Sequence, residues 1–254
     1  MKVVVTAGPT REYIDPVRFL SNPSTGKMGF AVAAEAARRG HSVTLVAGPV
    51  SLPTPKGVRR TDVTSAREML AAVLDALGLP DGPDEPAFLV SAAAVADWRP
   101  AHRADRKLKK SSMDGILRLV RNPDVLKTAV SAARRARRQK LLFAGFAAET
   151  GNPVPEAIRK CREKRLSFVV ANDVTAPGAG FGTDTNKVAI VYPDGRAENL
   201  PTMSKRAVAR RIVAAAELAA EPIRNGTRPG RCAPGSGHAS RALRQSCAPG
   251  RRRT

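Results

Sequence analysis

The sequence has few cysteines, few aromatic residues and no long apolar run. Its three cysteines, Cys161, Cys232 and Cys247, form no Cys-x-x-Cys pair and no metal-binding spacing, which indicates free thiols in a reducing compartment. Aromatic residues make up only 4% of the chain, so Ala, Val and Leu must fill the core. No segment approaches the roughly 20 apolar residues that span a bilayer, and Met1 leads directly into a strand pattern without a signal peptide. We therefore expect a cytoplasmic protein without membrane contact.

Acidic residues are also scarce, and the excess of basic residues is uneven. The 254 residues include 43 Lys and Arg against 22 Asp and Glu, a formal net charge of +21. Residues 222–254 are rich in Arg, Gly, Pro and Ser without any period, which predicts a disordered tail. Because this tail lacks the aromatic side chains that stack on bases, an extension without function is favoured over a nucleic-acid-binding arm. The remaining chain is still basic and suits an acidic partner, either nucleic acid or a phosphorylated small molecule.

Strand and helix patterns alternate through residues 1–221, which we expect to form one domain. Apolar, β-branched runs predict strands at residues 2–6, 42–47, 59–63, 87–96, 141–146 and 166–171, and a hairpin at 187–192 and 196–200. Helices are predicted at residues 26–39, after a capping box of Ser65 and Glu68, from Asn122-Pro123-Asp124, from Asn152-Pro153 to about Arg165, and after Ser204. This order predicts an α/β, Rossmann-like, doubly wound and mostly parallel sheet.

In such a sheet, ligands bind at the carboxyl ends of the strands. Small residues recur at the predicted ends, beginning with Gly8, and they let the backbone approach a ligand closely, although ordinary turn chemistry explains any single one of them. The polar segment 21–29 is a sharper signal because it opens a helix, whose free N–H groups hold anions. The segment is neither a P-loop nor Gly-x-Gly-x-x-Gly, since Ser21 and Met28 stand where the P-loop pattern requires Gly and Ser or Thr.

A second basic signal is the run Arg106-Lys107-Leu108-Lys109-Lys110, which follows a predicted central strand and Asp97-Trp98. A charge run is usually a solvated face, but several ammonium groups also suit the negative charges of a nucleoside triphosphate. The histidines His41, His102 and His238 are isolated, and we assign none of them a role.

Eight motifs follow one another along the chain. They are Val5-Thr6-Ala7-Gly8-Pro9-Thr10-Arg11-Glu12, Asp15-Pro16-Val17-Arg18, residues 22–29, Ala93-Ala94-Val95-Ala96-Asp97-Trp98, Lys107-Leu108-Lys109-Lys110, Asn122-Pro123-Asp124, Gly145-Phe146-Ala147-Ala148-Glu149-Thr150 and Ala171-Asn172-Asp173. Their order and spacing resemble phosphopantothenoylcysteine synthetase (phosphopantothenate–cysteine ligase), the synthetase half of the bifunctional bacterial coenzyme A biosynthesis flavoprotein. The resemblance runs from residue 2 to about residue 218.

The resemblance implies a ligase reaction in two steps. The carboxylate of 4'-phosphopantothenate attacks the α-phosphorus of CTP, forms an acyl-cytidylate and releases pyrophosphate. The amine of L-cysteine then attacks the acyl carbon and releases CMP. Because a carboxylate is a poor electrophile and the two phosphorylated substrates must meet, we expect a cationic site that uses Mg²⁺. The choice between CTP and ATP stays open at this stage.

The resemblance also assigns residues. It implies catalytic roles for Asn22, Lys107 and Arg18. The nucleotide-binding residues that it implies are Gly8, Ser24, Gly26, Ala93, Ala94, Asp97, Lys107, Lys109, Lys110, Asn122, Pro123, Asp124, Val125 and Phe146. Those that it implies for substrate binding are Arg18, Asn22, Ala93 and Asn172. Asp97 is the candidate metal ligand, with ribose and base as alternatives, and Asn122 is equally well explained as a plain helix cap.

The resemblance further implies a homodimer, for which residues 175–200 are the candidate dimerisation arm, since a hairpin gains from pairing across a two-fold axis. The flavin-dependent decarboxylase half is absent from this sequence, so either a separate decarboxylase acts next or the sequence is a fragment of a longer chain. Two other classes compete. A nicotinamide-dependent reductase would need Tyr-x-x-x-Lys, which neither Tyr13 nor Tyr192 provides, and a nucleic-acid-binding protein would rest on charge alone.

Overall fold

The computed structural model describes residues 1–224 except 110–114, 174, 176–179 and 181. Lys110 therefore lies outside the described residues, as do the predicted disordered tail from residue 225 onward and its cysteines and histidine.

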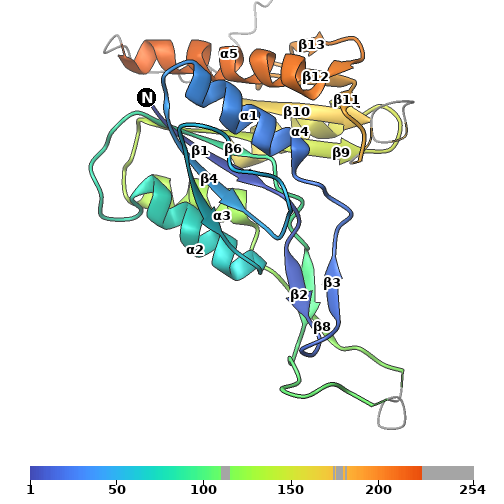
Figure 1. The fold of residues 1–254 in the computed structure, drawn as a ribbon. Coiled ribbons are helices and arrows are strands. Elements are labelled where there is room, and N and C mark those ends of the chain that lie inside the picture. The colour runs from blue at the N-terminus through green and yellow to red at the C-terminus, as the bar shows by residue number, and fades with distance from the viewer. Residues whose placement is uncertain (110–114, 174, 176–179, 181, 225–254) are drawn as a thin grey trace, which may run out of the picture.

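An eight-stranded sheet forms the centre of the molecule, in the order β13-β12-β10-β9-β6-β1-β4-β5 (Figure 1). Its strands are β1 (Lys2–Ala7), β4 (Ser42–Ala47), β5 (Val58–Asp62), β6 (Ala87–Ser91), β9 (Leu141–Glu149), β10 (Phe168–Asp173), β12 (Val188–Val191) and β13 (Ala197–Asn199). The strands from β5 to β10 in this order are parallel, and the pairings of β12 with β10 and with β13 are antiparallel. The chain winds outward from β1 in one direction and then from β6 in the other, which is the Rossmann order. The predicted fold class is confirmed.

The helices cover both faces of this sheet. They are α1 (Lys27–Arg38), α2 (Ala66–Leu77), α3 (Val125–Arg135), α4 (Val154–Lys164) and α5 (Lys205–Arg224). Residues of β1 alternate between the two layers: Val3 and Val5 pack under α1 and α5, whereas Val4 packs with α2 and its neighbours. Close packing compensates for the shortage of aromatics. A Cβ added at Gly29 of α1 would lie 2.5 Å from the Cβ of Ala7, so this helix lies directly on β1.

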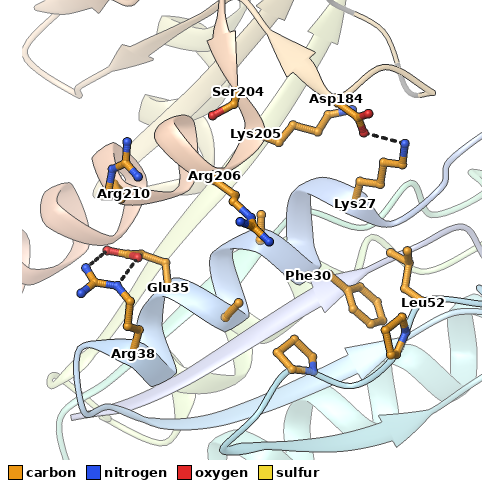
Figure 2. A pocket seen from close by; sticks show the side chains of 14 residues that line it. Lys27, Phe30, Glu35, Arg38, Leu52, Asp184, Ser204, Lys205, Arg206 and Arg210 are labelled. Carbon is orange, nitrogen blue, oxygen red and sulfur yellow. Dashed lines mark hydrogen bonds and ion pairs between the residues drawn. The ribbon is translucent and has the colours of Figure 1, made fainter.

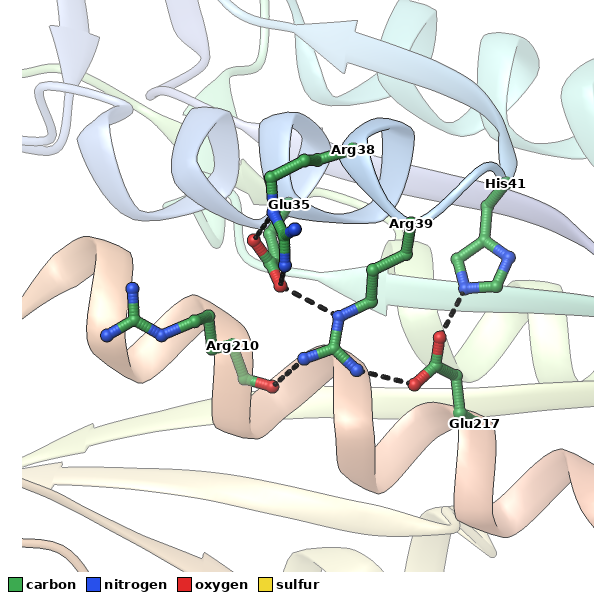
Figure 3. Close-up of polar contacts among 6 residues, drawn as sticks. All are labelled: Glu35, Arg38, Arg39, His41, Arg210 and Glu217. Atoms are coloured by element: carbon green, nitrogen blue, oxygen red, sulfur yellow. Dashed lines mark hydrogen bonds and ion pairs between the residues drawn. The ribbon is translucent and has the colours of Figure 1, made fainter.

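A network of ion pairs joins α1 to α5 at the edge of the molecule (Figure 3). The carboxylate of Glu35, which is only 8% exposed, accepts hydrogen bonds from Arg38 and Arg39. Arg39 also reaches across to Glu217 at 2.6 Å, and the ring of His41 lies 2.8 Å from the same carboxylate. The buried charge of Glu35 is therefore stabilised by two arginines, of which Arg39 also connects the end of α1 to α5.

This network predicts an acid-sensitive contribution to stability. The hydrogen bond from Arg38, supported by Arg39 against the effect of burial, lowers the pKa of Glu35 from 4.5 to about 2. A lowered pKa in the folded state stabilises the protein above the unfolded-state pKa, and this contribution is lost as the pH falls through the folded-state value. We expect Glu35→Gln to lower the free energy of unfolding above pH 4.5, with the difference shrinking toward pH 2. Urea titrations across this range, with Glu85→Gln in an exposed loop as control, measure it; a difference independent of pH would contradict it.

Two short hairpins form an arm that projects from one end of the sheet (Figure 1). They are β2 (Arg11–Tyr13) with β3 (Phe19–Ser21), and β7 (Trp98–Pro100) with β8 (Leu119–Arg121). We call the described parts of residues 11–21 and 98–121 the arm. The two hairpins are linked by a hydrogen bond of 2.9 Å from the Ala104 N–H to the Ile14 carbonyl. The sequence analysis predicted none of these strands.

The structure corrects several predicted boundaries. The strand predicted at residues 87–96 ends at Ser91, because the following residues bond to the loop after β1 instead. The predicted hairpin at 187–200 exists, but β12 pairs with β10 and so extends the main sheet, rather than standing apart as an arm. Its dimerising role remains a prediction. A separate pair, β11 (Thr185–Asn186) and β14 (Met203–Ser204), precedes α5, and α5 continues past residue 221 to Arg224.

Candidate active site

A cavity of about 400 Å³ opens at the carboxyl ends of the strands, where the winding of the sheet reverses between β1 and β6. Of the predicted site residues it is lined by Asn22, Ser24, Gly26, Ala93, Ala94, Asp97, Phe146 and Asn172. The structure thus brings together residues that are up to 150 positions apart in the chain, at the place where doubly wound folds bind their ligands.

The loop after β6 is held against the loop after β1 by a ladder of hydrogen bonds. The Ala93 N–H donates to the Thr6 hydroxyl at 3.1 Å, and the Ala94 N–H donates to the Gly8 carbonyl at 2.9 Å. The Ala96 N–H donates to the buried Thr10 hydroxyl at 3.0 Å. Gly8 does not line the cavity; it lies behind the wall with a φ of 77° and supports it.

Asn22 connects this wall to the segment that opens α1. Its Nδ2 donates to the carbonyls of Ala94 at 3.2 Å and Val95 at 3.1 Å. The segment then enters α1 through Gly26, whose φ of 77° suits glycine, and no side chain caps the first turn of the helix. The cavity is therefore bordered by the N-terminus of α1, and anion binding there remains a prediction.

A smaller cavity of about 190 Å³ continues the first one beyond Phe146, and the two share Ala93 and Asp97. The remaining predicted residues that line it are Asn122, Pro123, Asp124 and Val125. The helix cap here is Asp124, which accepts from the Lys127 N–H at 2.9 Å, and α3 begins at Val125. The interpretation of Asn122 as the cap is therefore wrong. Its Nδ2 instead donates to the Ala96 carbonyl at 2.8 Å and fixes the wall of the cavity.

The sequence analysis missed two lysines of α4. Lys160 lines both cavities and donates to the Phe146 carbonyl at 2.6 Å, and Lys164 forms an ion pair with Asp124 at 2.5 Å. Burial lowers the pKa of Lys160. Burial raises the pKa of Asp124, but the hydrogen bonds from Lys164 and the Lys127 N–H, together with the charges of Lys164 and Lys160, outweigh burial, and the net pKa is lowered. Their spacing of four residues puts both lysines on one face of α4, which in the sequence is indistinguishable from a solvated face.

The structure places the other predicted cations elsewhere. Arg18 lies in the arm, where its guanidinium donates to Asp15 and to the Leu108 carbonyl at 2.9 Å. These hydrogen bonds hold the pKa of Asp15 well below its ordinary value. Lys107 and Lys109 are exposed in the loop of the arm beside Leu108, and neither lines the cavities. Within one chain, Arg18 therefore positions the backbone between Lys107 and Lys109, and it does not line the cavity beside Asn22.

A larger hollow of about 760 Å³ lies outside α1, between the start of α5 and the loop that contains Leu52 (Figure 2). Lys27 and Lys205 line both this hollow and the active-site cavity, and Lys27 forms an ion pair with Asp184 at 2.7 Å. These side chains therefore form the partition between the two spaces.

Other types of site have little support in the part of the chain that the structure describes. There, no group of three or more His, Cys, Asp or Glu side chains could hold a metal ion on its own. No described helix is long and apolar enough to cross a membrane. Tyr13 lies in the arm and Tyr192 follows β12, and neither lines the cavities, so the tyrosine chemistry of a nicotinamide-dependent reductase has no place here.

Comparisons with known proteins agree with this geometry. The family model described as "DNA/pantothenate metabolism flavoprotein C-terminal domain" matches residues 1–218. The coenzyme A biosynthesis bifunctional protein CoaBC of Escherichia coli K12 is 46% identical over 198 residues, which cover 77% of this chain and 46% of that protein. The Bacillus subtilis CoaBC is 44% identical over 227 residues, which cover 89% of this chain and 53% of that protein. The chain thus spans about half the length of these curated relatives.

A solved structure identifies which half is matched. The crystal structure of the C-terminal domain of a CoaBC protein superposes with a TM-score of 0.68 at 38% identity and covers 85% of this chain and 94% of that one. These comparisons confirm the resemblance that the eight motifs indicate. The chain belongs to the family of DNA/pantothenate metabolism flavoprotein C-terminal domains.

Proposed function

We propose that this chain ligates 4'-phosphopantothenate to L-cysteine, with CTP as the nucleotide that activates the acid. The observation that carries the proposal is one cavity at the switch point of the sheet, bordered by Asn22, Asp97 and Phe146 and by the uncapped start of α1. The matched relatives are named as bifunctional coenzyme A biosynthesis proteins, and the chain matches their C-terminal half. The proposal assigns the ligase activity to that half, in the cytoplasm.

In this proposal the nucleotide occupies the region where the two cavities meet. Phe146 and the Asn122-Pro123 turn border the base, and the ammonium of Lys160 faces the phosphates. Burial lowers the pKa of Lys160, and a bound phosphate would favour its charged form. Lys164 keeps Asp124 neutralised, so this carboxylate does not repel the nucleotide.

The acid lies between the nucleotide and Asn22. Its carboxylate oxygen forms a bond to the α-phosphorus of CTP, the bond to the β-phosphate oxygen breaks, and pyrophosphate leaves with the electron pair. Fixed N–H donors and cations that face this charge are the main source of rate acceleration in such a step. The first turn of α1 and Lys160 are the described groups of this chain that offer them.

The residues present could hold Mg²⁺ only together with phosphate oxygens of the bound nucleotide. Asp97 is exposed at the mouth of both cavities and no carboxylate cluster accompanies it among the described residues. One carboxylate with phosphate oxygens and waters is a typical Mg²⁺ environment. When bound there, the ion would neutralise triphosphate charge, and Asp97 would orient it.

Lys107 can take part in this chemistry only if a second copy supplies it. Six of the seven large apolar side chains that are exposed in the described chain lie in the arm: Val17, Phe19, Trp98, Ile116, Leu117 and Leu119. Exposed apolar side chains gathered on one projecting element are typical of an interface. We therefore propose a homodimer in which the arm contacts the partner copy and brings Lys107 to its cavity. A flavin-dependent decarboxylase is the proposed next enzyme, since the product keeps the cysteine carboxylate.

The α4 lysine provides a prediction that the sequence motifs did not. We expect Lys160→Gln to raise the KM for CTP by roughly 10-fold or more, because removing one buried phosphate-facing charge costs about 1.4 kcal/mol or more. The KM for cysteine should stay unchanged. Steady-state kinetics with Lys127→Gln, an exposed lysine of α3, as the matched control measure this effect. A KM for CTP that is equal in Lys160→Gln and the control would remove Lys160 from the nucleotide site.

Pyrophosphate release tests the function as a whole. The purified protein is incubated with 4'-phosphopantothenate and either CTP or ATP, with and without cysteine. We expect pyrophosphate from CTP without cysteine, limited to about one equivalent per site, and continuous turnover when cysteine is added. Absence of pyrophosphate with both nucleotides would refute the proposed function, and preference for ATP would refute only the choice of nucleotide.

A further inference from the structure

Two side-chain oxygens at one end of the active-site cavity are buried without a hydrogen-bond donor among the described residues. They are the Oδ1 atoms of Asn172 and Asn186. Asn172 is 8% exposed and Asn186 is 4% exposed, and both line the cavity of about 400 Å³. A buried acceptor without a donor destabilises the folded protein, so its presence beside a cavity points to a ligand that donates to it.

The sheet brings these two oxygens to the same place. Asn172 lies near the end of β10 and pairs with Val188, which is two residues beyond Asn186. Within β10, Asn172 lies on the same face as Val170, which packs in the layer of α1. The Nδ2 of Asn186 lies 3.9 Å from the Sδ of Met28, in the first turn of that helix. Both asparagines therefore line the same cavity as the segment from Asn22 to Met28.

The chemistry of the two oxygens restricts what can bind there. Phosphate and carboxylate oxygens carry lone pairs, so two carbonyl-type acceptors disfavour them. A group with two N–H bonds can instead donate one hydrogen bond to each of the two asparagine oxygens. A neutral primary amine has two N–H bonds and one lone pair, and if each asparagine oxygen accepts one N–H, the direction of the lone pair is set.

We propose that Asn172 and Asn186 bind the α-amino group of L-cysteine and direct its lone pair toward the activated acyl group beside Asn22. The inference rests on the proposed ligase function and extends it to the third substrate. The cysteine ammonium first loses one proton to water. The nitrogen then forms the C–N bond, the bond between the acyl carbon and the phosphate oxygen breaks, and CMP leaves with that electron pair. The second proton passes from nitrogen to the departing phosphate.

The same end offers a counter-charge for the carboxylate of the amino acid. Figure 2 shows Lys27 and Lys205 extending toward Asp184 at the partition of the cavity. The ammonium of Lys205 donates to the carbonyls of Gly180 and Thr183, and burial lowers its pKa. Two ammonium groups and one carboxylate leave this border positive, which suits an amino acid better than a simple amine.

Separating the two half-reactions tests the proposal. Asn186→Leu and Asn172→Leu keep the branched shape of the side chain and remove the acceptor, and Asn199→Leu on an exposed position of β13 is the matched control. We expect both variants to raise the KM for cysteine at least 10-fold. Pyrophosphate release from CTP and 4'-phosphopantothenate without cysteine should stay within twofold of the unmodified protein. Hydroxylamine, a nucleophile without the amino-acid framework, should trap the activated acid at the unmodified rate.

Each alternative outcome has a defined meaning. If the KM for cysteine is unchanged while pyrophosphate release is normal, the asparagines do not bind the amine and the proposal fails. If the folded variants lose pyrophosphate release, as judged with far-ultraviolet circular dichroism, the asparagines serve the nucleotide or the acid instead and the proposal also fails. If the unmodified protein itself releases no pyrophosphate, the ligase function fails first, and the two failures are thereby distinguished.

Discussion

Co-expressed Asn22→Asp and Lys107→Gln chains should together regain about a quarter of the unmodified ligase activity, although each variant alone is nearly inactive. The reason is geometric. Asn22 lines the cavity at the strand ends, whereas Lys107 is exposed in the arm and lines neither cavity of its own chain. In the proposed dimer, a mixed pair contains one site with both native residues and one site with neither. About half of the dimers in such a mixture are mixed, and the mixed dimer isolated through two different affinity tags should show about half of the unmodified activity.

A second mixture provides the control. A chain that carries both substitutions is co-expressed in excess over the unmodified chain. If the site is shared, every mixed dimer is inactive, because each of its cavities meets either a changed Asn22 or a changed Lys107. If the site lies within one chain, the unmodified chain keeps its activity in the mixture. Retained activity in the mixed dimer would therefore refute the shared site.

The fold was predictable because its main signals are local and strong. Val-rich runs such as residues 2–6 are buried on both faces in a parallel sheet, and helices with glycine or capping residues at their ends separate them. The arm was not predictable in this way. Its strands are three residues long, too short to show alternation, and long-range contacts such as that from Arg18 to the Leu108 carbonyl support them.

The candidate site also contains residues that the sequence predicted and residues that only the fold revealed. The segment around Asn22 and the turn at Asn122 were visible as motifs in the sequence. In the structure, however, Asp124 caps α3, and the Asn122 side chain donates to the distant Ala96 carbonyl instead. Lys160 resembled a solvated helical lysine until the fold placed it against Phe146. Asn186 carried no sequence signal at all, since a single asparagine before a strand is usually part of a turn. Its significance comes from burial without a donor among the described residues.

Asn22→Asp tests the second half-reaction most directly. In the native chain the Nδ2 of Asn22 donates to the carbonyls of Ala94 and Val95, so the side chain holds the wall of the cavity beside the activated acid. A carboxylate at this position would face those two carbonyl oxygens without a proton to donate, and it would add a negative charge next to an acyl phosphate that is already anionic. The wall beside the tetrahedral adduct would then lose two hydrogen bonds, and the collapse of the adduct would meet an opposing charge.

We expect Asn22→Asp to slow amide formation at least ~100-fold, which corresponds to about 2.7 kcal/mol of transition-state stabilisation. Release of the first equivalent of pyrophosphate should persist, because the nucleotide end with Lys160 and Phe146 is unchanged. The acyl-nucleotide should therefore accumulate and be recovered by rapid quench and mass spectrometry. Asn22→Ala separates the two causes: it removes the donor without adding charge, and we expect it to slow amide formation less. If Asn22→Asp formed the amide at the native rate, the side chain would serve only the wall, and the acyl group would have to be activated by groups elsewhere in the cavity.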